Sequence, residues 1–114
     1  MSAYAIAHLR TPHINAEVLA YIERIQETMN PFGGRFLVHG GEVDAREGSW
    51  PGTVVVIEFP DMAQARTWYD SSAYQEILPL RTRNIEGEAI LVDGVGPDYD
   101  ASRTARRLRA GIAR

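Results

Sequence analysis

The stretch Thr53-Val-Val-Val-Ile-Glu-Phe59, with the residues that follow it, decides the fold of this chain. Its run of valine and isoleucine is typical of a buried strand. Asp61, with Gln64 three residues later, is typical of the start of a helix, and this helix carries Trp68-Tyr69. A last strand is predicted over Glu88–Asp93. The stretch therefore predicts a strand, a helical segment and a second strand.

Two signals divide the helical segment between these strands. Ser71-Ser72 interrupts the first helix, and Gln75, three residues after Ser72, predicts that a second helix begins there. Pro79 has no amide N–H group, so we expect it to kink or end this second helix.

The first half of the chain repeats the same layout. A strand covered on both faces is predicted over Tyr4–Arg10, a helix over residues 15–29 with Asn15 as its N-cap, and a strand over Arg35–His39. Gly40-Gly41 predicts a bulge or bend near the end of that strand. The order strand, helix, strand, strand, helix, strand is the ferredoxin-like split βαβ pattern. We therefore expect an α+β fold with an antiparallel or mixed four-stranded sheet.

Composition limits the kinds of protein this chain can be. Its 114 residues, 45% of them apolar and 24% charged, predict one folded domain. The chain has no cysteine, which excludes disulfides and thiolate metal sites. A net charge of −3 argues against a general nucleic-acid binder. No run reaches membrane-spanning length and no charged-then-apolar leader opens the sequence, so we expect a cytoplasmic protein without a membrane partner.

The composition changes abruptly after Gly96. Residues 1–96 form the predicted domain, and residues 97–114 form an arginine-rich tail with a thin helical stripe that includes Ala105 and Leu108. A short tail of this kind is typically a solvated helix or a frayed end, and we expect no nucleic-acid partner.

The predicted topology suggests which polar residues meet. We expect the first and third strands to lie side by side and parallel at the centre of the sheet. Their C-terminal ends would then bring His8 and Glu58 together. Counting back from the hairpin places Arg35 opposite Glu58 and His39 opposite Val54. The fourth strand would begin at the same end, which makes Glu86 or Glu88 a possible neighbour.

Two interpretations of this polar end are open. In one, Arg35 and Glu58 form a cross-strand pair that fixes the register, with His8 hydrogen-bonded nearby. In the other, the three residues form the polar end of a small-molecule pocket in which a carboxylate and an imidazole exchange protons.

Three further residues are candidates for ligand binding. His39 is either a satisfied strand histidine or part of a site, and no histidine has metal-ligand spacing, so no metal or cofactor is expected. Trp68 and Tyr69 are neighbours on one helix, so one of them packs inward and the other meets a pocket, a partner or solvent. Arg81 either binds an anionic ligand or pairs with Glu86.

Several of these residues together resemble a known family. The pattern consists of Gly33-Gly34-Arg35, Glu58-Phe59-Pro60, Ala65, Trp68-Tyr69, Ser71, Tyr74-Gln75, Pro79 and Arg81. It resembles the family named domain of unknown function 1330, over roughly residues 3–95. The resemblance implies a ferredoxin-like subunit of the dimeric α+β barrel superfamily, in which two sheets pack face to face and the helices lie outside. It implies no established activity. The wider superfamily includes cofactor-independent monooxygenases, haem-handling enzymes and ligand-sensing modules.

The sequence supports two main hypotheses about function. The first is a small-molecule-binding or catalytic homodimer, with one pocket in each subunit lined by Arg35, Glu58, Trp68 and Arg81. The second is a non-catalytic dimeric module, regulatory or interacting, in which the same residues only hold the fold. A monooxygenase-like or haem-handling enzyme is a further alternative, and the isolation of each histidine argues against haem or a metal. We expect a homodimer in every case, because the sheet is apolar on both faces and the helices are too few to cover both.

Overall fold

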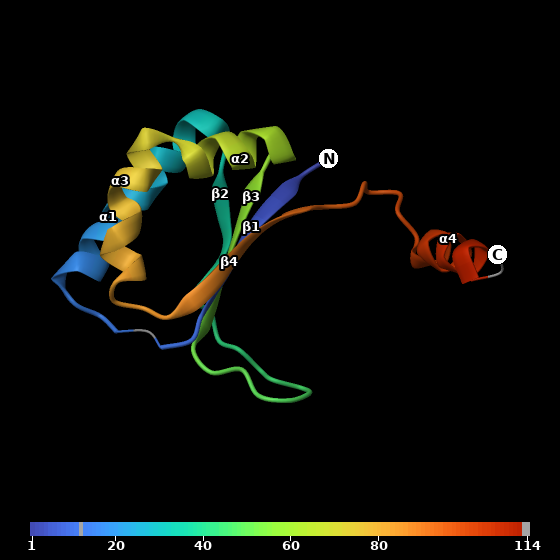
Figure 1. The fold of residues 1–114 in the computed structure, drawn as a ribbon, viewed down its shortest axis with the longest axis horizontal. Helices are drawn as coiled ribbons and strands as arrows, with labels where there is room; N and C mark the ends of the chain where they lie inside the picture. The colour runs from blue at the N-terminus through green and yellow to red at the C-terminus, as the bar shows by residue number, and fades with distance from the viewer. Residues whose placement is uncertain (12, 113–114) are drawn as a thin grey trace.

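The computed structural model describes residues 1–11 and 13–112; Pro12 and the end of the predicted tail at Arg114 lie outside this range. It contains a four-stranded sheet with helices packed on one face (Figure 1). The elements in chain order are β1 (Ala3–Leu9), α1 (Ala16–Met29), the 3-10 helix η1 (Asn30–Phe32), β2 (Arg35–His39), β3 (Thr53–Phe59), α2 (Met62–Asp70), α3 (Ser72–Thr82), β4 (Gly87–Asp93) and α4 (Ala101–Ile112). The predicted α+β, ferredoxin-like order is confirmed.

The strand order in the sheet is β2-β3-β1-β4, and every pair of neighbours is antiparallel. The prediction that β1 and β3 lie at the centre was right, but the prediction that they run parallel was wrong. A helical crossover connects two parallel strands. Here α1 connects β1 to β2, and α2 with α3 connects β3 to β4. In the sheet, β3 lies between β1 and β2, and β1 lies between β3 and β4. Each inserted strand runs opposite to its neighbours, so β1 and β3 are antiparallel.

The two faces of the sheet have different surroundings. The helix face packs against α1, α2 and α3, and its residues Ala5, Ile57 and Phe59 belong to the buried core. The open face carries the alternate residues, such as Ile6 and Val56, which are paired across β1 and β3. Figure 1 shows no helix of the domain packed on this second face.

Local signals set the helix boundaries. The Asn15 side chain accepts a hydrogen bond from the amide of Val18, and Asp61 accepts one from the amide of Gln64, so both predicted N-caps are confirmed. The second helical piece is capped by Ser71, one residue earlier than predicted.

Pro79 lies inside α3 and does not end it, so of the two predicted effects, a kink or an end, the end does not occur. The inner face of this helix carries Tyr74, Ile77 and Arg81, which are buried at helical spacing. Burial of this stripe outweighs the one backbone hydrogen bond that the proline removes.

The bulge in β2 lies before the position that the glycines suggested. The register shifts between Phe36 and Val38, whereas Gly40, with φ of 72°, only ends the strand. The extra residue moves His39 opposite Val55 instead of the predicted Val54. Because side chains alternate between faces, this shift by one residue turns His39 onto the helix face.

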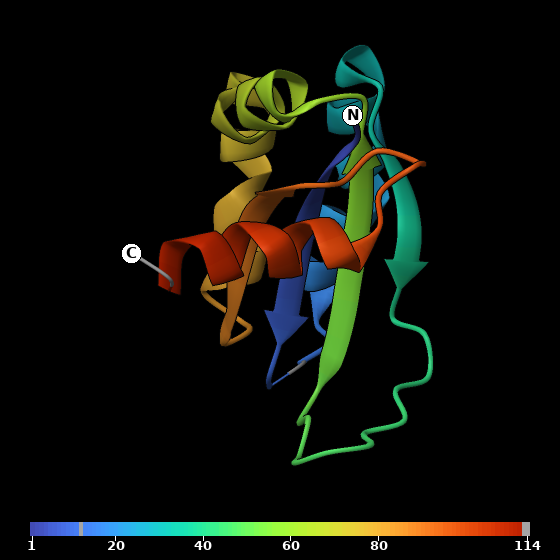
Figure 2. The ribbon, with the colours of Figure 1, turned by 90° about the vertical axis from the view of Figure 1, so that its right-hand side faces the viewer.

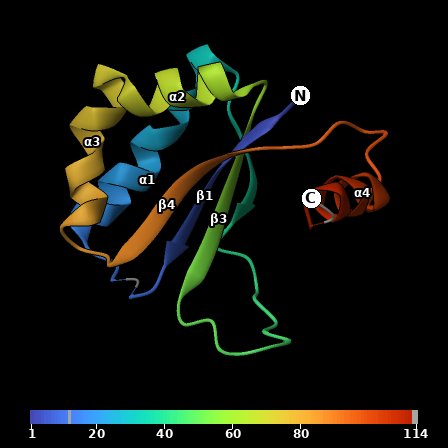
Figure 3. The ribbon, with the colours of Figure 1, turned by 45° about the vertical axis from the view of Figure 1, so that its right-hand side comes forward.

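The tail folds as α4 but packs little on the domain. Figures 1 and 3 show α4 on the opposite side of the sheet from α1, α2 and α3, and set apart from the strands. None of its residues is buried, and Leu108 and Ile112 are 57% and 83% exposed. The apolar stripe of α4 therefore contributes little to the stability of the chain.

A chain that ends at Pro97 should keep the domain fold. The removed segment buries almost no apolar surface, so we expect the melting temperature to change by less than about 2 °C. Thermal unfolding followed by circular dichroism, at matched protein concentration, measures the change. A loss of several degrees would show that the tail docks, and the idea of a dispensable tail would be wrong.

Candidate functional site

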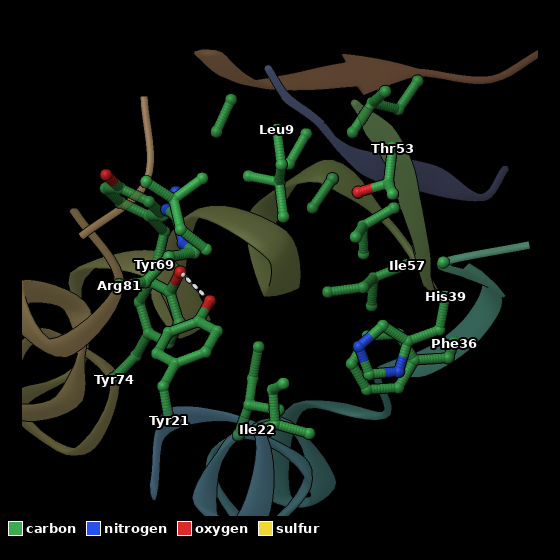
Figure 4. A pocket seen from close by; sticks show the side chains of 18 of the residues that line it. Leu9, Tyr21, Ile22, Phe36, His39, Thr53, Ile57, Tyr69, Tyr74 and Arg81 are labelled. Carbon is green, nitrogen blue, oxygen red and sulfur yellow. Dashed lines mark hydrogen bonds between the residues drawn. The ribbon is translucent and has the colours of Figure 1, made fainter. Parts of the chain in front are cut away.

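A cavity of about 540 Å³ lies between the helix face of the sheet and the helices that cover it (Figure 4). It exists because the sheet presents small side chains there: Ala5 and Ala7 on β1, and Ala89 beside them on β4. Several of its lining residues are exposed to solvent: Ile14, Ile22, His39, Gly40, Ala89 and Ile90. The sequence therefore leaves room under the helices that larger strand residues would fill.

Aromatic rings form much of the wall. The Trp68 ring is buried, with its centroid 4.2 Å from that of Tyr74. Its indole Nε1–H donates a hydrogen bond of 3.0 Å to the Thr28 hydroxyl oxygen, so the polar group of this side chain is already engaged. Trp68 is thus the inward-facing member of the adjacent aromatic pair, and it offers the cavity only carbon surface.

One end of the cavity is polar. The hydroxyl groups of Tyr21 and Tyr74 are hydrogen-bonded, 2.8 Å apart, and the Arg81 guanidinium carbon lies 5.5 Å from the centroid of the Tyr21 ring (Figure 4). Burial, and next the proximity of Tyr74, raise the pKa of Tyr21 well above its ordinary value. With its pKa raised in this way, the Tyr21 hydroxyl stays protonated and neutral at neutral pH.

His39 lies at a second position in the wall. Its ring stacks on that of Phe36, with centroids 4.2 Å apart. Figure 4 shows this pair across the cavity from Arg81 and Tyr21. The bulge in β2 brings both rings to the same face, and the cavity gains an imidazole from it.

The structure separates the six predicted site residues. His39, Trp68 and Arg81 line the cavity, whereas Arg35, Glu58 and His8 lie on the strand positions of the open face.

The predicted pairing of Arg35 with Glu58 is confirmed. The Arg35 Nε–H donates to Glu58 Oε1 at 2.8 Å, and the two residues are directly opposite in the sheet. The hydrogen bond from Arg35, followed by one from Ser2, lowers the pKa of the Glu58 carboxyl group. The Arg35 side chain is 70% exposed, so the pair resembles a surface contact that fixes register.

The prediction that His8 joins this pair was wrong. Because β1 and β3 are antiparallel, His8 lies opposite Val54 and Glu88, at the other end of the strands. Its ring stacks on Trp50 at 3.9 Å and its Nε2–H donates to the carbonyl oxygen of Pro51 at 2.7 Å. Glu88 likewise lies at this end, where Arg10 pairs with it at 2.9 Å.

The sequence reasoning missed the residues that define the cavity. Tyr21, Phe36 and Tyr74 line the cavity but are not among the site residues that the sequence indicated, and Tyr74 entered only through the family pattern. The usable signal was the alternation of Ala5 and Ala7 in a central strand, which predicts a hollow on the face that the helices cover.

Other kinds of site have no support in the part of the chain that the structure describes. Within residues 1–11 and 13–112, no three or more histidine, aspartate or glutamate side chains gather as a metal ion would require. In the same ranges no helix combines the length and apolar character needed to cross a membrane.

Residues 2–95 match the family described as domain of unknown function (DUF1330). This chain belongs to that family. The match covers the whole sheet, the three helices on it and the cavity between them, and it ends before α4. Among curated proteins, no relative was found.

Solved structures with a similar fold include proteins of different descriptions. One is a protein of unknown function from Rhodopseudomonas palustris, 15% identical, with 84% of each chain covered and a TM-score of 0.60. A dimeric ferredoxin-like protein of unknown function from Jannaschia sp. CCS1 is 8% identical over 82% of this chain and 100% of that one, with a TM-score of 0.64. SnoaB, a cofactor-independent oxygenase from Streptomyces nogalater, is 12% identical over 87% of this chain and 98% of that one, with a TM-score of 0.58. At these identities the likeness shows the fold alone.

Replacement of Glu58 by Gln tests whether the open-face ion pair is structural. The folded-state pKa of Glu58 is lowered, so the pair stabilises the fold above the unfolded pKa of about 4.3 and loses that effect as the pH falls through the folded pKa. We expect Glu58→Gln to lower the melting temperature by about 1–3 °C at pH 7, and the difference from wild type to shrink toward pH 3.

Thermal unfolding of both proteins at pH 7 and pH 3 measures this effect. Glu47→Gln, a change in the exposed loop, is the matched control and should show no pH-dependent difference. An equal difference at the two pH values would contradict the assignment.

Proposed function

We propose that this protein binds a small, largely apolar molecule in the cavity between the helix face and α1, α2 and α3. The observation that supports this is a mainly apolar space of about 540 Å³ whose lining includes the Arg81 guanidinium, the His39 imidazole and the hydrogen-bonded hydroxyl pair of Tyr21 and Tyr74. Small-molecule sites are typically apolar pockets of about 300–1,000 Å³ with a few placed polar groups.

Binding is better supported than a particular reaction. Among the described lining residues, His39 is the one imidazole and there is no carboxylate, so the set contains no histidine–carboxylate pair for general acid–base catalysis. Both a ligand-dependent regulatory module and an enzyme require the binding step that the cavity supports.

A second copy of this chain is the proposed occupant of the open face. Ile90 and Val92 on this face are 55% and 38% exposed, and they continue an apolar surface formed by Ile6 and Val56. Contiguous exposed apolar residues on a sheet face commonly mark an interface with another chain. Two proteins with a similar fold, from Jannaschia sp. CCS1 and Thermobifida fusca, are described as dimeric and ferredoxin-like, which supports a homodimer here.

A variant that fills the cavity tests the binding proposal. Ala7 lies on the cavity floor, so Ala7→Phe should occupy the space and abolish binding of the neutral fluorophore N-phenylnaphthylamine. We expect wild type to bind one fluorophore per chain, measured by fluorescence titration. Ala63→Phe, the same change on the exposed side of α2, is the matched control and should bind like wild type. Equal binding by Ala7→Phe, or the absence of binding by wild type for this fluorophore and for every other apolar probe, would overturn the proposal.

A charge on the open face tests the homodimer. Val92→Glu would bury an unpaired carboxylate between two sheets, so we expect it to weaken dimerisation by at least about 100-fold. Sedimentation equilibrium at micromolar concentration measures the change. Leu19→Glu, on the exposed side of α1, should leave the dimer intact. A wild-type protein that is monomeric at these concentrations would count decisively against the assembly.

A further inference from the structure

Arg81 is a buried cation without a partner of opposite charge in the described chain. It is 8% exposed and extends from the inner face of α3 to the cavity. The ion pairs formed by the described residues all involve other arginines. A buried guanidinium is usually paired with a carboxylate, so an arginine at this position without one requires an explanation.

The groups around Arg81 stabilise its charge but carry no counter-charge. Burial lowers the pKa of Arg81, and the neighbouring Tyr21 and Tyr74 raise it by more than burial lowers it. Glu86, the partner that the sequence suggested, lies near Arg10, with 3.8 Å between the nearest charged atoms. The hydroxyl of Tyr21 stays neutral because burial and the neighbouring Tyr74 raise its pKa. The face of the Tyr21 ring gives a cation–π contact with Arg81, which is weaker than a contact with a full negative charge.

From this arrangement we infer that the ligand of the cavity is a monoanion, a carboxylate on an apolar body, and that Arg81 binds the carboxylate. This inference rests on the proposed function, since it names the class of molecule that the cavity binds.

The chemistry of the walls gives the class of ligand. A guanidinium is planar and donates two parallel hydrogen bonds to a carboxylate, which suits a carboxylic acid better than a spherical anion. Among the described lining residues Arg81 is the one side chain with a permanent positive charge, so a ligand with a single negative charge matches the cavity. The remaining surface is aromatic and aliphatic, and it fits a hydrocarbon body. His39, across the cavity, suits a polar substituent far from the carboxylate.

Matched pairs of probes test the inference: 2-naphthoate with its neutral amide 2-naphthamide, and decanoate with decanamide. By isothermal titration calorimetry at pH 7, we expect wild type to bind at least one of the acids at least about 10-fold more tightly than its amide. Arg81→Met keeps the size of the side chain and removes its charge, so it should lose this preference. Arg81→Lys should keep a weaker preference, and Arg66→Met, on the exposed side of α2, should keep it in full.

The stability of the ligand-free protein gives a second measurement. If the role of Arg81 is to bind the ligand, Arg81→Met removes a buried charge that has no carboxylate partner in the ligand-free protein. This variant should then unfold at the melting temperature of wild type or above it. The acid that binds should then raise the melting temperature of wild type and not that of Arg81→Met. A large loss of stability in Arg81→Met, together with an unchanged preference for acids over amides in Arg81→Lys and Arg81→Met, would show a structural arginine and overturn the inference.

The outcomes separate this inference from the proposed function. Equal affinity of wild type for the acid and the amide in both pairs would overturn the carboxylate assignment and leave the cavity as a binding site. Binding of N-phenylnaphthylamine without binding of either acid would also overturn the assignment alone. Absence of binding for the fluorophore and for all four probes would overturn both.

Discussion

The antiparallel pairing of β1 with β3 is the constraint on which the rest of the structure depends. It sets Ala5 opposite Ile57 and Ala7 opposite Val55, and it therefore decides which side chains lie under the helices. Since strand residues alternate between faces with a period of two, a shift by one position would exchange the helix face and the open face completely. The small residues under the helices, the cavity above them and the exposed apolar residues on the other side all follow from this single register.

A cavity with a charge in its wall is costly for a small domain. Protein interiors are normally packed to the density of organic crystals, and unfilled volume lowers stability. Ala5 and Ala7 occupy positions where Val or Ile would pack more tightly against the helices, and Arg81 occupies a position that Met or Leu would suit better in an apolar core. Both departures are consistent with the proposed ligand, because its apolar body would fill the volume and its anionic group would compensate the charge.

The parts of the structure that the sequence predicted were those that depend on near neighbours. Strand and helix positions, the caps at Asn15 and Asp61, and the pairing of Arg35 with Glu58 follow from periodicity, capping chemistry and hairpin counting. The direction of β1 relative to β3 depends on which strands each crossover joins, and an error there placed His8 at the wrong end of the sheet. The site was less predictable still, because the isolation of Arg81 from carboxylates is a property of its surroundings in space.

The irregular backbone of β2 and the loop after it place side chains of one connection on both faces of the sheet. The bulge between Phe36 and Val38 turns His39 toward the cavity, and the chain then leaves the strand at Gly40. Figure 2 shows the long loop that follows, which returns to β3 beside the end of β1. Trp50, near the end of this loop, stacks on His8 of the open face. The return depends on Gly52, whose φ is 86° and whose Cβ, if it had one, would lie 1.8 Å from the carbonyl oxygen of Leu9. A side chain at that position would force the loop away from β1 and separate Trp50 from His8. The bulge and this glycine therefore let a single connection contribute a ring to the cavity at its start and a ring to the open face at its end.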